Sequence, residues 1–419
     1  MPVVNVGSSN KESYFLTFTD AYTKKETSEY ITTNSNVNTA IDIENYAIVA
    51  LDDKKGIAID KSLTKTDLAE MGVETAGRSQ ATKNKKLCIF QNTTPYLYGY
   101  NIEDFTYTNV TRSSSMCYTS NSAAIDIGDY ALFAGGLKSY PSYYSNNAVE
   151  AIKDATVSNP ASLSVGLSYP IGVKAGNYAL IAGGTENWNQ QNGGTPSSVV
   201  NAYNSSLTRS IPNAMSSSRV YHSCASIGNY ALIAGGTNDG TQYTATVDVY
   251  DGSLTRSNAS DLSVARIYMG ATSVGDYVLF AGGSYKPNRY GRPYDGVDTY
   301  NASLTKSIAS SLTTGGGMSY ATSVGNYALI TNHESGEYRT KIEPYEYFDN
   351  SLYNMFADQK YILDITIPKY SNYKFTESTE KKTGINEINK SYYNYGPGIT
   401  GYIKINGNTN LTGNINITS

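Results

Sequence analysis

The sequence predicts an all-β protein in which a long domain of repeated four-stranded sheets is followed by a small β-rich domain. Three observations predict this fold class. A nine-residue block recurs about every fifty residues, which indicates a repeat architecture. The apolar runs are as short as strands and end at Gly, Asn or Asp, which favour turns. Tyr occurs 39 times, against nine Phe and one Trp, and its ring with a polar tip suits a half-buried strand.

The recurring block places an apolar strand between two glycine turns. Its copies are GDYALFAGG at 128–136, GNYALIAGG at 176–184 and 228–236, GDYVLFAGG at 275–283 and GNYALITNH at 325–333. The five leading glycines lie 48, 52, 47 and 50 residues apart. A period of this length is typical of structural repeats that pack against their neighbours. We therefore expect each period to form one sheet of a larger array.

Two weaker copies lie upstream of these five. ENYAIVALD at 44–52 keeps the Asn-Tyr-Ala start, and NKKLCIFQN at 84–92 keeps only the apolar strand. Counting both gives seven repeats. We therefore expect seven sheets, and leave six and eight open as alternatives. Sheets repeated radially form a β-propeller, which leaves only short and protected strand edges.

Each repeat is expected to contribute four strands. A segment such as CASIG (224–228) or ATSVG (271–275) forms the first strand, and the Gly-Asn or Gly-Asp pair makes the hairpin turn. Tyr-Ala-Leu-Ile-Ala forms the second, and the Gly-Gly pair ends it where backbones approach closely. The last two strands flank a turn that begins with Asn or Asp. They are VVNAYN (199–204), TVDVYD (246–251) and GVDTYN (296–301), then SLTRSIP (206–212), SLTRSNA (253–259) and SLTKSIA (303–309).

The glycine pair after an apolar strand, followed by a tyrosine in strand three, resembles the kelch family of β-propellers. The resemblance covers residues 10–356 approximately. It departs from the kelch pattern in strand four, where Ser-Leu-Thr-Arg/Lys-Ser stands in place of the kelch tryptophan. We expect Leu207, Leu254 and Leu304 to fill the space between sheets instead.

This variant motif is similar to repeats in tail and receptor-binding proteins of phages from low-GC Gram-positive bacteria. A composition rich in Asn, Tyr, Ile and Lys agrees with an AT-rich genome. The resemblance implies a non-enzymatic, tail-associated virion protein whose propeller binds a host surface glycan or protein. Two alternatives stay open: a structural scaffold or decoration propeller within a particle or assembly, and a glycan-active enzyme.

The two ends of the repeat region leave closure of the ring open. SYFLTFTDAYTKKETS (13–28) and YEYFDNSLYNMF (345–356) both resemble strands three and four, and one of them must complete the last sheet. From Ala357 the period stops, and KYILDITIP (360–368) and YIKINGNTNLTGNINI (402–417) alternate apolar and polar residues. We therefore expect a kelch-like propeller over 1–356 and a small β-rich domain over 357–419. That domain is a candidate for attachment to other tail proteins or for homo-oligomerisation.

Charge and composition argue against several other classes of function. The net charge is −4 with no basic patch, so we expect no nucleic-acid partner. No apolar run approaches the ~20 residues that span a bilayer, so we expect no membrane insertion. The N-terminus lacks the pattern of a secretory signal, which favours synthesis in the host cytoplasm before assembly into a virion. Cys88, Cys117 and Cys224 have no CxxC spacing, and we interpret them as small core residues.

No catalytic constellation stands out. The two histidines, His222 and His333, are not spaced to share a metal. No P-loop, GxSxG or HExxH motif occurs. Glycoside hydrolysis would need a pair of carboxylates. The candidates lie in predicted turns or loops, where solvated side chains are common: Glu186, Asp239, Asp251 and Asp295. We therefore expect no enzymatic activity, no metal and no cofactor.

The variable loops between strands two and three carry the candidate ligand-binding residues. The loops 137–147, 185–198, 237–245 and 284–296 would all emerge on one face of a propeller. Their aromatic rings can stack on sugars or anchor a protein partner, and their amide and guanidinium groups can bind hydroxyls. The candidates are Tyr143, Trp188, Asn189, Gln190, Tyr243, Tyr285, Arg289, Tyr290, Arg292 and Tyr294.

Arg219 and Arg266 also stand at matching positions, nine residues before Gly228 and Gly275. One interpretation points them toward the same face or the central channel. We favour the other, in which each makes a structural hydrogen bond to a neighbouring sheet.

Overall fold

The computed structural model describes most residues from Ile31 to Tyr347, and outside this range only the backbones of strands. Gaps in the described range fall at 34, 36, 52–54, 69–79, 92–95, 141, 190–192, 287–291 and 334–339. The chain divides into two compact bodies. One contains Ile31–Pro344, and the other combines Met1–Tyr30 with Tyr345–Ser419. All the described elements are strands, so the predicted all-β class is confirmed.

The body from Ile31 to Pro344 is a series of antiparallel four-stranded sheets, one for each repeat of the sequence. Repeat 1 contains β5 (Val37–Ile43), β6 (Tyr46–Leu51), β7 (Gly56–Asp60) and β8 (Lys65–Leu68). Repeat 2 contains β9 (Ala81–Lys83), β10 (Leu87–Phe90), β11 (Tyr96–Asn101) and β12 (Tyr107–Thr111). Repeat 3 contains β14 (Ala123–Ile127), β15 (Tyr130–Ala134), β18 (Val149–Lys153) and β19 (Thr156–Ser158).

The remaining repeats follow the same order. Repeat 4 contains β20 (Ile171–Ala175), β21 (Tyr178–Ala182), β24 (Val200–Asn204) and β25 (Arg209–Ser210). Repeat 5 contains β26 (Ser223–Ile227), β27 (Tyr230–Ala234), β28 (Val247–Tyr250) and β29 (Arg256–Ala259). Repeat 6 contains β31 (Gly270–Val274), β32 (Tyr277–Ala281), β35 (Val297–Asn301) and β36 (Lys306–Ala309). Repeat 7 contains β37 (Tyr320–Val324), β38 (Tyr327–His333), β39 (Thr340–Tyr347) and β4 (Ile31–Thr33).

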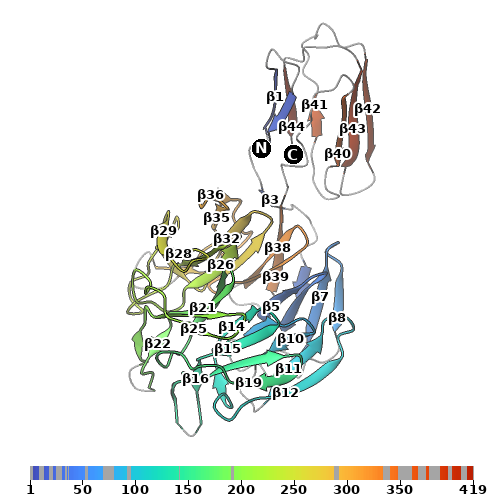
Figure 1. Ribbon diagram of the computed structural model, residues 1–419. Coiled ribbons are helices and arrows are strands. Elements are labelled where there is room, and N and C mark those ends of the chain that lie inside the picture. Colours follow the sequence, from blue (N-terminus) through green and yellow to red (C-terminus); the bar gives the residue numbers. More distant parts are fainter. Residues whose placement is uncertain are drawn as a thin grey trace. The chain divides into compact units, whose positions relative to one another are not determined.

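The first strands of successive sheets lie beside one another. β5 lies beside β9, and the series continues through β14, β20, β26 and β31 to β37, which lies beside β5 (Figure 1). The fold is therefore propeller-like, with the first strand of each repeat beside that of the next.

The fourth strand of repeat 7 comes from the N-terminal side of the chain. β4 pairs with β39, with Ile31 opposite Ile342 and Thr33 opposite Thr340. This strand lies just after the segment 13–28 and carries no repeat motif. Tyr345–Tyr347 extend β39, and residues 348–356 of the other candidate lie outside the described residues.

Apolar residues form clusters between adjacent sheets. One cluster joins repeats 3 and 4 and includes Leu132 and Ile181, and others join later pairs of repeats. Leu207, Leu254 and Leu304 pack against the edges of three such clusters, as expected for side chains that replace the kelch tryptophan. A further cluster joins repeat 7 to repeat 1. The core is thus divided among the contacts between sheets, as stacked repeats require.

The Gly-Gly pair marks a close approach between neighbouring sheets. Gly183 has a φ of 62°, and a Cβ there would lie 2.9 Å from the carbonyl oxygen of Arg219 in the next repeat. The amide of Gly184 donates to that same carbonyl at 3.1 Å. Both the backbone conformation and the lack of space therefore require glycine.

The other body combines segments from both ends of the chain, so its limits differ from the predicted boundary at residue 356. The N-terminal strand β1 (Val3–Ser8) pairs with β44 (Gly413–Thr418) and with β2 (Tyr14–Thr17), and β44 also pairs with β41 (Lys374–Thr376). A second sheet consists of β40 (Tyr361–Thr366), β43 (Ile399–Asn406) and β42 (Glu387–Asn394). β3 (Tyr22–Lys24) pairs with Tyr345–Tyr347. β1 and β2 therefore belong with the C-terminal strands, because their backbone hydrogen bonds are made there.

Candidate binding face

One face of the repeat body gathers the connections that vary most in sequence. Because the strands of each sheet alternate in direction, the loops from strand two to three emerge with the connections that enter the next repeat. Several of them form small hairpins. These are β16 (Leu137–Lys138) with β17 (Tyr144–Ser145) and β13 (Thr119–Ser120), β22 (Thr185–Glu186) with β23 (Thr195–Pro196), and β33 (Ser284–Tyr285) with β34 (Arg292–Pro293) and β30 (Arg266–Ile267). We call this side the loop face.

A pocket of about 250 Å³ opens at the loop-face ends of the first strands. Every repeat contributes to its lining, from Thr39 in repeat 1 and Gln80 in repeat 2 to Ser319 in repeat 7. We call it the mouth pocket. A site shared by all the sheets is held in place by the whole body rather than by one loop.

Three tyrosines at one repeat position line the mouth pocket. Tyr169, Tyr221 and Tyr268 each lie seven residues before the turn glycine of their repeat, and each is partly exposed. The ring centroids of Tyr169 and Tyr221 are 5.7 Å apart, and those of Tyr221 and Tyr268 are 4.7 Å apart. We call these three residues the tyrosine arc.

The backbone of the tyrosine arc is strained. The three tyrosines have φ values of 58°, 61° and 61°, in the left-handed region that side chains with a Cβ avoid at a cost of roughly 1–2 kcal/mol per residue. The conformation is fixed by main-chain bonds between repeats, such as Tyr268 N–H to the carbonyl of Tyr221 at 3.1 Å. Asn121 holds the same position in repeat 3 with a φ of 51°. The backbone would thus accept Asn, and the use of Tyr three times in succession points to a role for the rings.

The described residues that line the mouth pocket include no Asp, Glu, Lys or Arg. His222 also lines it, and burial, with a smaller contribution from Arg219, lowers the pKa of His222 to about 3. This histidine is therefore neutral at physiological pH. The lining combines tyrosine rings with hydroxyl, amide and small apolar groups.

Buried ion pairs hold the connections beneath the loop face. Arg219 pairs with Asp248 at 2.5 Å, and Arg266 pairs with Asp298 at 2.8 Å, with all four side chains fully buried. Burial lowers the pKa of both arginines, and the adjacent carboxylates oppose that shift. The structural role expected for these arginines is confirmed, but each carboxylate lies in the repeat that the arginine enters rather than in a neighbouring one.

The same strand-three position anchors the chain as it enters repeats 3 to 7. Asp248 accepts hydrogen bonds from the amide and hydroxyl of Ser216, at 3.1 and 2.9 Å. Asp298 binds Ser263 in the same way. The equivalent residues of repeats 3, 4 and 7 bind a Ser or Thr at the same point: Glu150 with Ser113, Asn201 with Ser164, and Glu343 with Thr313. In these five repeats a polar side chain on strand three thus binds the connection that enters the repeat.

The structure places the predicted site residues in three groups around the loop face. Tyr143 and Trp188, from adjacent repeats, have ring centroids 5.7 Å apart, and Asn189 is exposed beside Trp188. Tyr243 lies under the ammonium of Lys286, at 5.7 Å.

The third group belongs to repeat 6. Tyr285 packs edge-on against Tyr294 at 5.5 Å, and the guanidinium of Arg266 lies 4.8 Å from the Tyr294 ring. Arg292 is exposed on β34. Gln190, Arg289 and Tyr290 lie outside the described residues.

None of the predicted site residues that the structure describes lines the mouth pocket, and the sequence prediction did not include the tyrosine arc. Its signal was present as a tyrosine at a constant distance before the turn glycine in three successive repeats. With 39 tyrosines in the chain, that spacing alone did not separate ring function from composition.

The residues considered for catalysis are engaged in local structure. The hydroxyl of Thr241, with the amides of Thr241 and Gln242, lowers the pKa of Asp239, and Ser253 and Thr255 do the same for Asp251. Glu186 accepts a hydrogen bond from Ser197 at 2.6 Å. The side chain of His333 lies outside the described residues.

Cysteine and metal chemistry can be stated only for the part of the chain that the structure describes. No group of three His, Cys, Asp or Glu side chains gathers there as a metal site would require. Cys88 is buried, as expected of a core residue, and Cys224 is partly buried, with its thiol 3.2 Å from the carbonyl of Gly172. No helix in this part has the length and apolarity to cross a membrane.

Comparison with known proteins bears on the fold. No protein-family profile matches the chain, and no curated protein is similar to it in sequence. A solved structure described as "Structure of YjhT" is similar to 70% of this chain and 100% of its own, with a TM-score of 0.52 and 11% identity. At this level of identity the likeness concerns the arrangement of the sheets alone.

Proposed function

We propose that this chain is a non-enzymatic, tail-associated virion protein whose repeats close into a seven-bladed kelch-like propeller and bind an uncharged glycan on the host surface. The closed ring is supported by the position of β37 beside β5 and by the apolar cluster that joins repeats 7 and 1. β4 would then fasten the ring with a strand from the other end of the repeat region. The likeness to the YjhT structure supports the same arrangement of sheets.

The observation that carries the proposed ligand class is an uncharged pocket lined by strained tyrosines. Rings stack on the apolar faces of sugars, and phenol, hydroxyl and amide groups bind their hydroxyls. A pocket without ionised side chains gives an anionic or cationic ligand no partner, and a buried unpaired charge is costly. The volume of the mouth pocket suits about one sugar residue.

We propose a non-enzymatic protein because the carboxylates are not placed for hydrolysis of a glycoside. Hydrolysis of a glycoside by two carboxylates needs them on opposite sides of one bond, at roughly 5–9.5 Å. Among the described lining residues of the mouth pocket there is no carboxylate. Asp239 and Asp251 belong to turns that they stabilise themselves.

Assignment to a phage tail rests on the sequence resemblance and on the AT-rich composition. A role in host attachment agrees with a rigid body that presents variable loops on one face. The strands that gather the two chain ends would then provide attachment to other tail proteins.

Binding to host surfaces tests the proposal. Labelled protein is incubated with intact Gram-positive cells and with purified walls from the same strains. We expect saturable binding that falls in Tyr221→Ala and persists in Tyr96→Ala, which removes a tyrosine that is 46% exposed on β11. Release of reducing sugar from walls would support the enzyme alternative. Failure to bind any wall, with tight binding to a phage structural protein, would support the scaffold alternative.

A further inference from the structure

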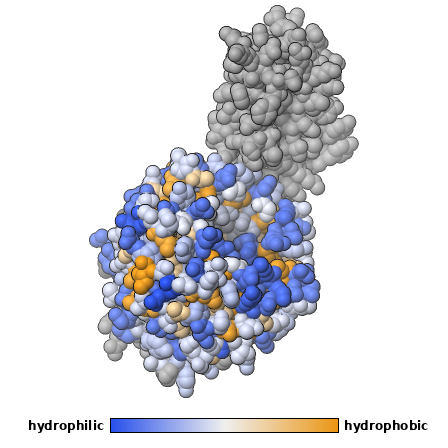
Figure 2. All heavy atoms as spheres, in the orientation of Figure 1, coloured by the Kyte–Doolittle hydropathy of each residue, from blue (hydrophilic) through white to orange (hydrophobic). Residues whose placement is uncertain are grey.

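Exposed aromatic side chains concentrate on one hairpin of the loop face. Tyr118, Tyr140, Tyr143 and Tyr144 are 41%, 65%, 43% and 41% exposed, and all lie in or beside the β16–β17 hairpin of repeat 3. Tyr118 packs against Tyr140 at 5.5 Å, and Tyr143 packs against Trp188 of repeat 4. We call these five residues the side platform. On the face shown in Figure 2, hydrophobic residues form small separate patches among polar ones.

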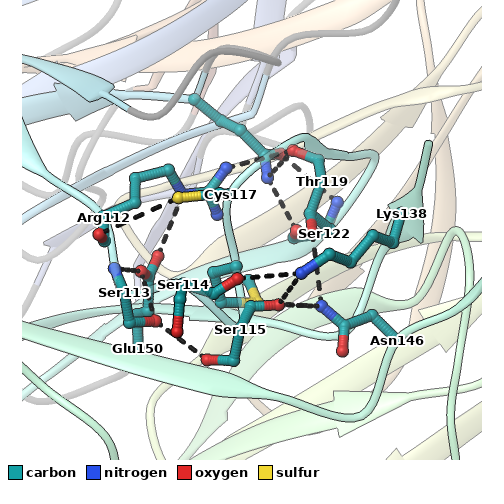
Figure 3. A network of polar contacts seen from close by, with 12 residues as sticks. Arg112, Ser113, Ser114, Ser115, Cys117, Thr119, Ser122, Lys138, Asn146 and Glu150 are labelled. Carbon is teal, nitrogen blue, oxygen red and sulfur yellow. Dashed lines mark hydrogen bonds and ion pairs between the residues drawn. The ribbon is translucent and has the colours of Figure 1, made fainter. Parts of the chain in front are cut away.

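A polar network holds the base of this hairpin (Figure 3). The ammonium of Lys138 donates to the carbonyls of Ser114 and Ser115, both at 2.9 Å, and its side chain is nearly buried. The amide of Asn146 donates to the same Ser115 carbonyl at 2.9 Å and to the hydroxyl of Thr119 at 3.2 Å. The strand ends on both sides of the hairpin are therefore tied to the chain that enters repeat 3.

A buried ion pair lies in the same network. The guanidinium of Arg112 pairs with Glu150 at 3.1 Å and donates to the carbonyl of Thr119 at 3.0 Å. Glu150 also accepts hydrogen bonds from the amide and hydroxyl of Ser113. Arg112 and Glu150 are both buried, so their bonds are not weakened by water. The tyrosines thus project from a hairpin with a rigid base.

Trp188 is tied to the same hairpin by a serine. Ser145, in β17, donates from its hydroxyl to the carbonyl of Thr185 at 2.9 Å and accepts from the amide of Trp188 at 3.1 Å. These bonds fix the hairpin of repeat 4 against that of repeat 3. The Tyr143–Trp188 pair is consequently in place before any ligand arrives, which lowers the entropy cost of binding.

The side platform is also uncharged. Lys138 and Glu186 are the charged residues in 137–145 and 185–196, and both side chains are engaged in the bonds described above. The platform residues are all aromatic, and aromatic residues are also enriched in protein interfaces, so the neutral surround is what favours a sugar chain here. Rings with polar tips and a neutral surround match the alternating apolar faces and hydroxyls of a sugar chain.

We propose that the side platform is a second subsite, which stacks on a residue further along the same uncharged glycan that the mouth pocket binds. This inference rests on the proposed function. Two subsites on one polymer raise the affinity for long chains above that for short ones, because the second contact is intramolecular. A protein ligand is the competing outcome of the test.

The single tryptophan of the chain provides a local reporter. The uncharged polysaccharide fraction of walls that bind the protein is titrated into the full chain while Trp188 emission is recorded, and calorimetry measures affinity independently. We expect a saturable change in emission and affinity roughly tenfold lower in Tyr143→Ala. Tyr143→Phe, which keeps the ring, and Tyr96→Ala, which removes an equally exposed tyrosine elsewhere, should bind as the parent does.

The outcomes separate this inference from the proposed function. Calorimetric binding with unchanged Trp188 emission and no effect of Tyr143→Ala would overturn the side platform and leave the mouth pocket in place. Equal affinity for mono- and polysaccharide would also overturn it. Binding to a purified surface protein but to no wall polysaccharide would overturn both proposals.

Discussion

The first strands of the repeats differ sharply between their two ends. One end of each first strand leads into the turn to strand two. Two residues before that turn, the strands carry Asp42, Lys83, Asp126 and Lys174 in repeats 1 to 4, and serine in repeats 5 to 7. Lys83 pairs with Asp42 at 2.5 Å, and Lys174 pairs with Asp126. At the loop-face end, the lining contains tyrosines and no charged residue among those described. The first strands therefore carry charged side chains at the turn end, whereas the described lining of the mouth pocket has none.

The charges nearest to the mouth pocket are buried and paired. Arg219 and Arg266 lie two residues before Tyr221 and Tyr268, yet their guanidinium groups face carboxylates inside the sheet. The open ion pairs at the turn end keep access to water, with Lys174 and Asp126 39% and 26% exposed. The comparison shows that exposed ion pairs join neighbouring sheets at the turn end, whereas the other end has the neutral lining that the proposed ligand requires.

Removing a buried carboxylate should have the largest effect. In Asp248→Ala, Arg219 would keep its charge without a partner, which costs about 3–5 kcal/mol of unfolding free energy. Asp126→Ala, at the turn end, breaks an exposed pair and should cost ~1 kcal/mol or less. Denaturant unfolding of both variants measures the difference. Equal losses would contradict the distinction between the two ends.

Repeat 4 supplies a matched control for that prediction. It has Asn201 in place of the aspartate and Leu167 in place of the arginine. The double variant Arg219→Leu/Asp248→Asn copies this pairing into repeat 5. We expect it to recover most of the stability that Asp248→Ala loses, because no buried charge remains.

Acid should lower the free energy of unfolding through His222, which lies at the loop-face end. The folded protein holds this histidine neutral with a pKa of about 3, whereas the unfolded chain protonates it near pH 6.5. The unfolded state therefore binds more protons below pH 6.5, and stability falls by about 2 kcal/mol between pH 7 and pH 5. In His222→Met, which copies Met269 of repeat 6, this part of the loss should vanish. An unchanged pH dependence in urea unfolding would show that His222 is not held neutral by the fold.

The tyrosine arc should contribute more to binding than to stability. Tyr221→Asn places at repeat 5 the residue that repeat 3 uses in the same left-handed conformation. We expect stability to change by no more than ~1 kcal/mol, because Asn tolerates this backbone, and affinity for wall polysaccharide to fall at least tenfold. Calorimetry and thermal unfolding measure the two effects, with Tyr221→Phe as the variant that keeps the ring. Wild-type affinity in the Asn variant would remove the arc from the site.

A charge introduced into the mouth pocket should give the smallest effect. Gln80→Glu adds one negative charge to the lining with almost no change in shape. We expect a loss of affinity of several-fold, because the carboxylate must lose water when the ligand enters. Lys174→Met changes the charge at the turn end and should leave affinity unchanged. The opposite order of effects would locate the ligand at the turn end.

The repeated part of the fold could be predicted from sequence because its signals recur at fixed positions. The Gly-Gly pair, the Asn or Asp turn and the leucine of strand four each recur at the same place in successive repeats. The pairing of β4 with β39 could not be predicted, since Ile31–Thr33 carries no repeat motif. The pairing of β1 with β44 joins the two ends of the chain and leaves no local signal.

The candidate site was predicted in part. The variable loops were predicted to share one face and to carry Tyr143 and Trp188, whose rings the structure brings together, because loop composition can be read from the sequence. The mouth pocket was missed, because a left-handed φ at Tyr221 depends on hydrogen bonds to neighbouring repeats. The partner of Arg219 was likewise hidden, since Asp248 reaches it only when strand three is in register with strand two.

The affinity of the protein for uncharged and for anionic wall polymers, compared at low and high salt, tests the central claim most directly. An uncharged mouth pocket predicts binding to neutral polysaccharide that is nearly independent of salt and is lost in Tyr221→Ala. Binding only to an anionic polymer such as teichoic acid, with affinity that falls steeply as salt rises, would contradict the account.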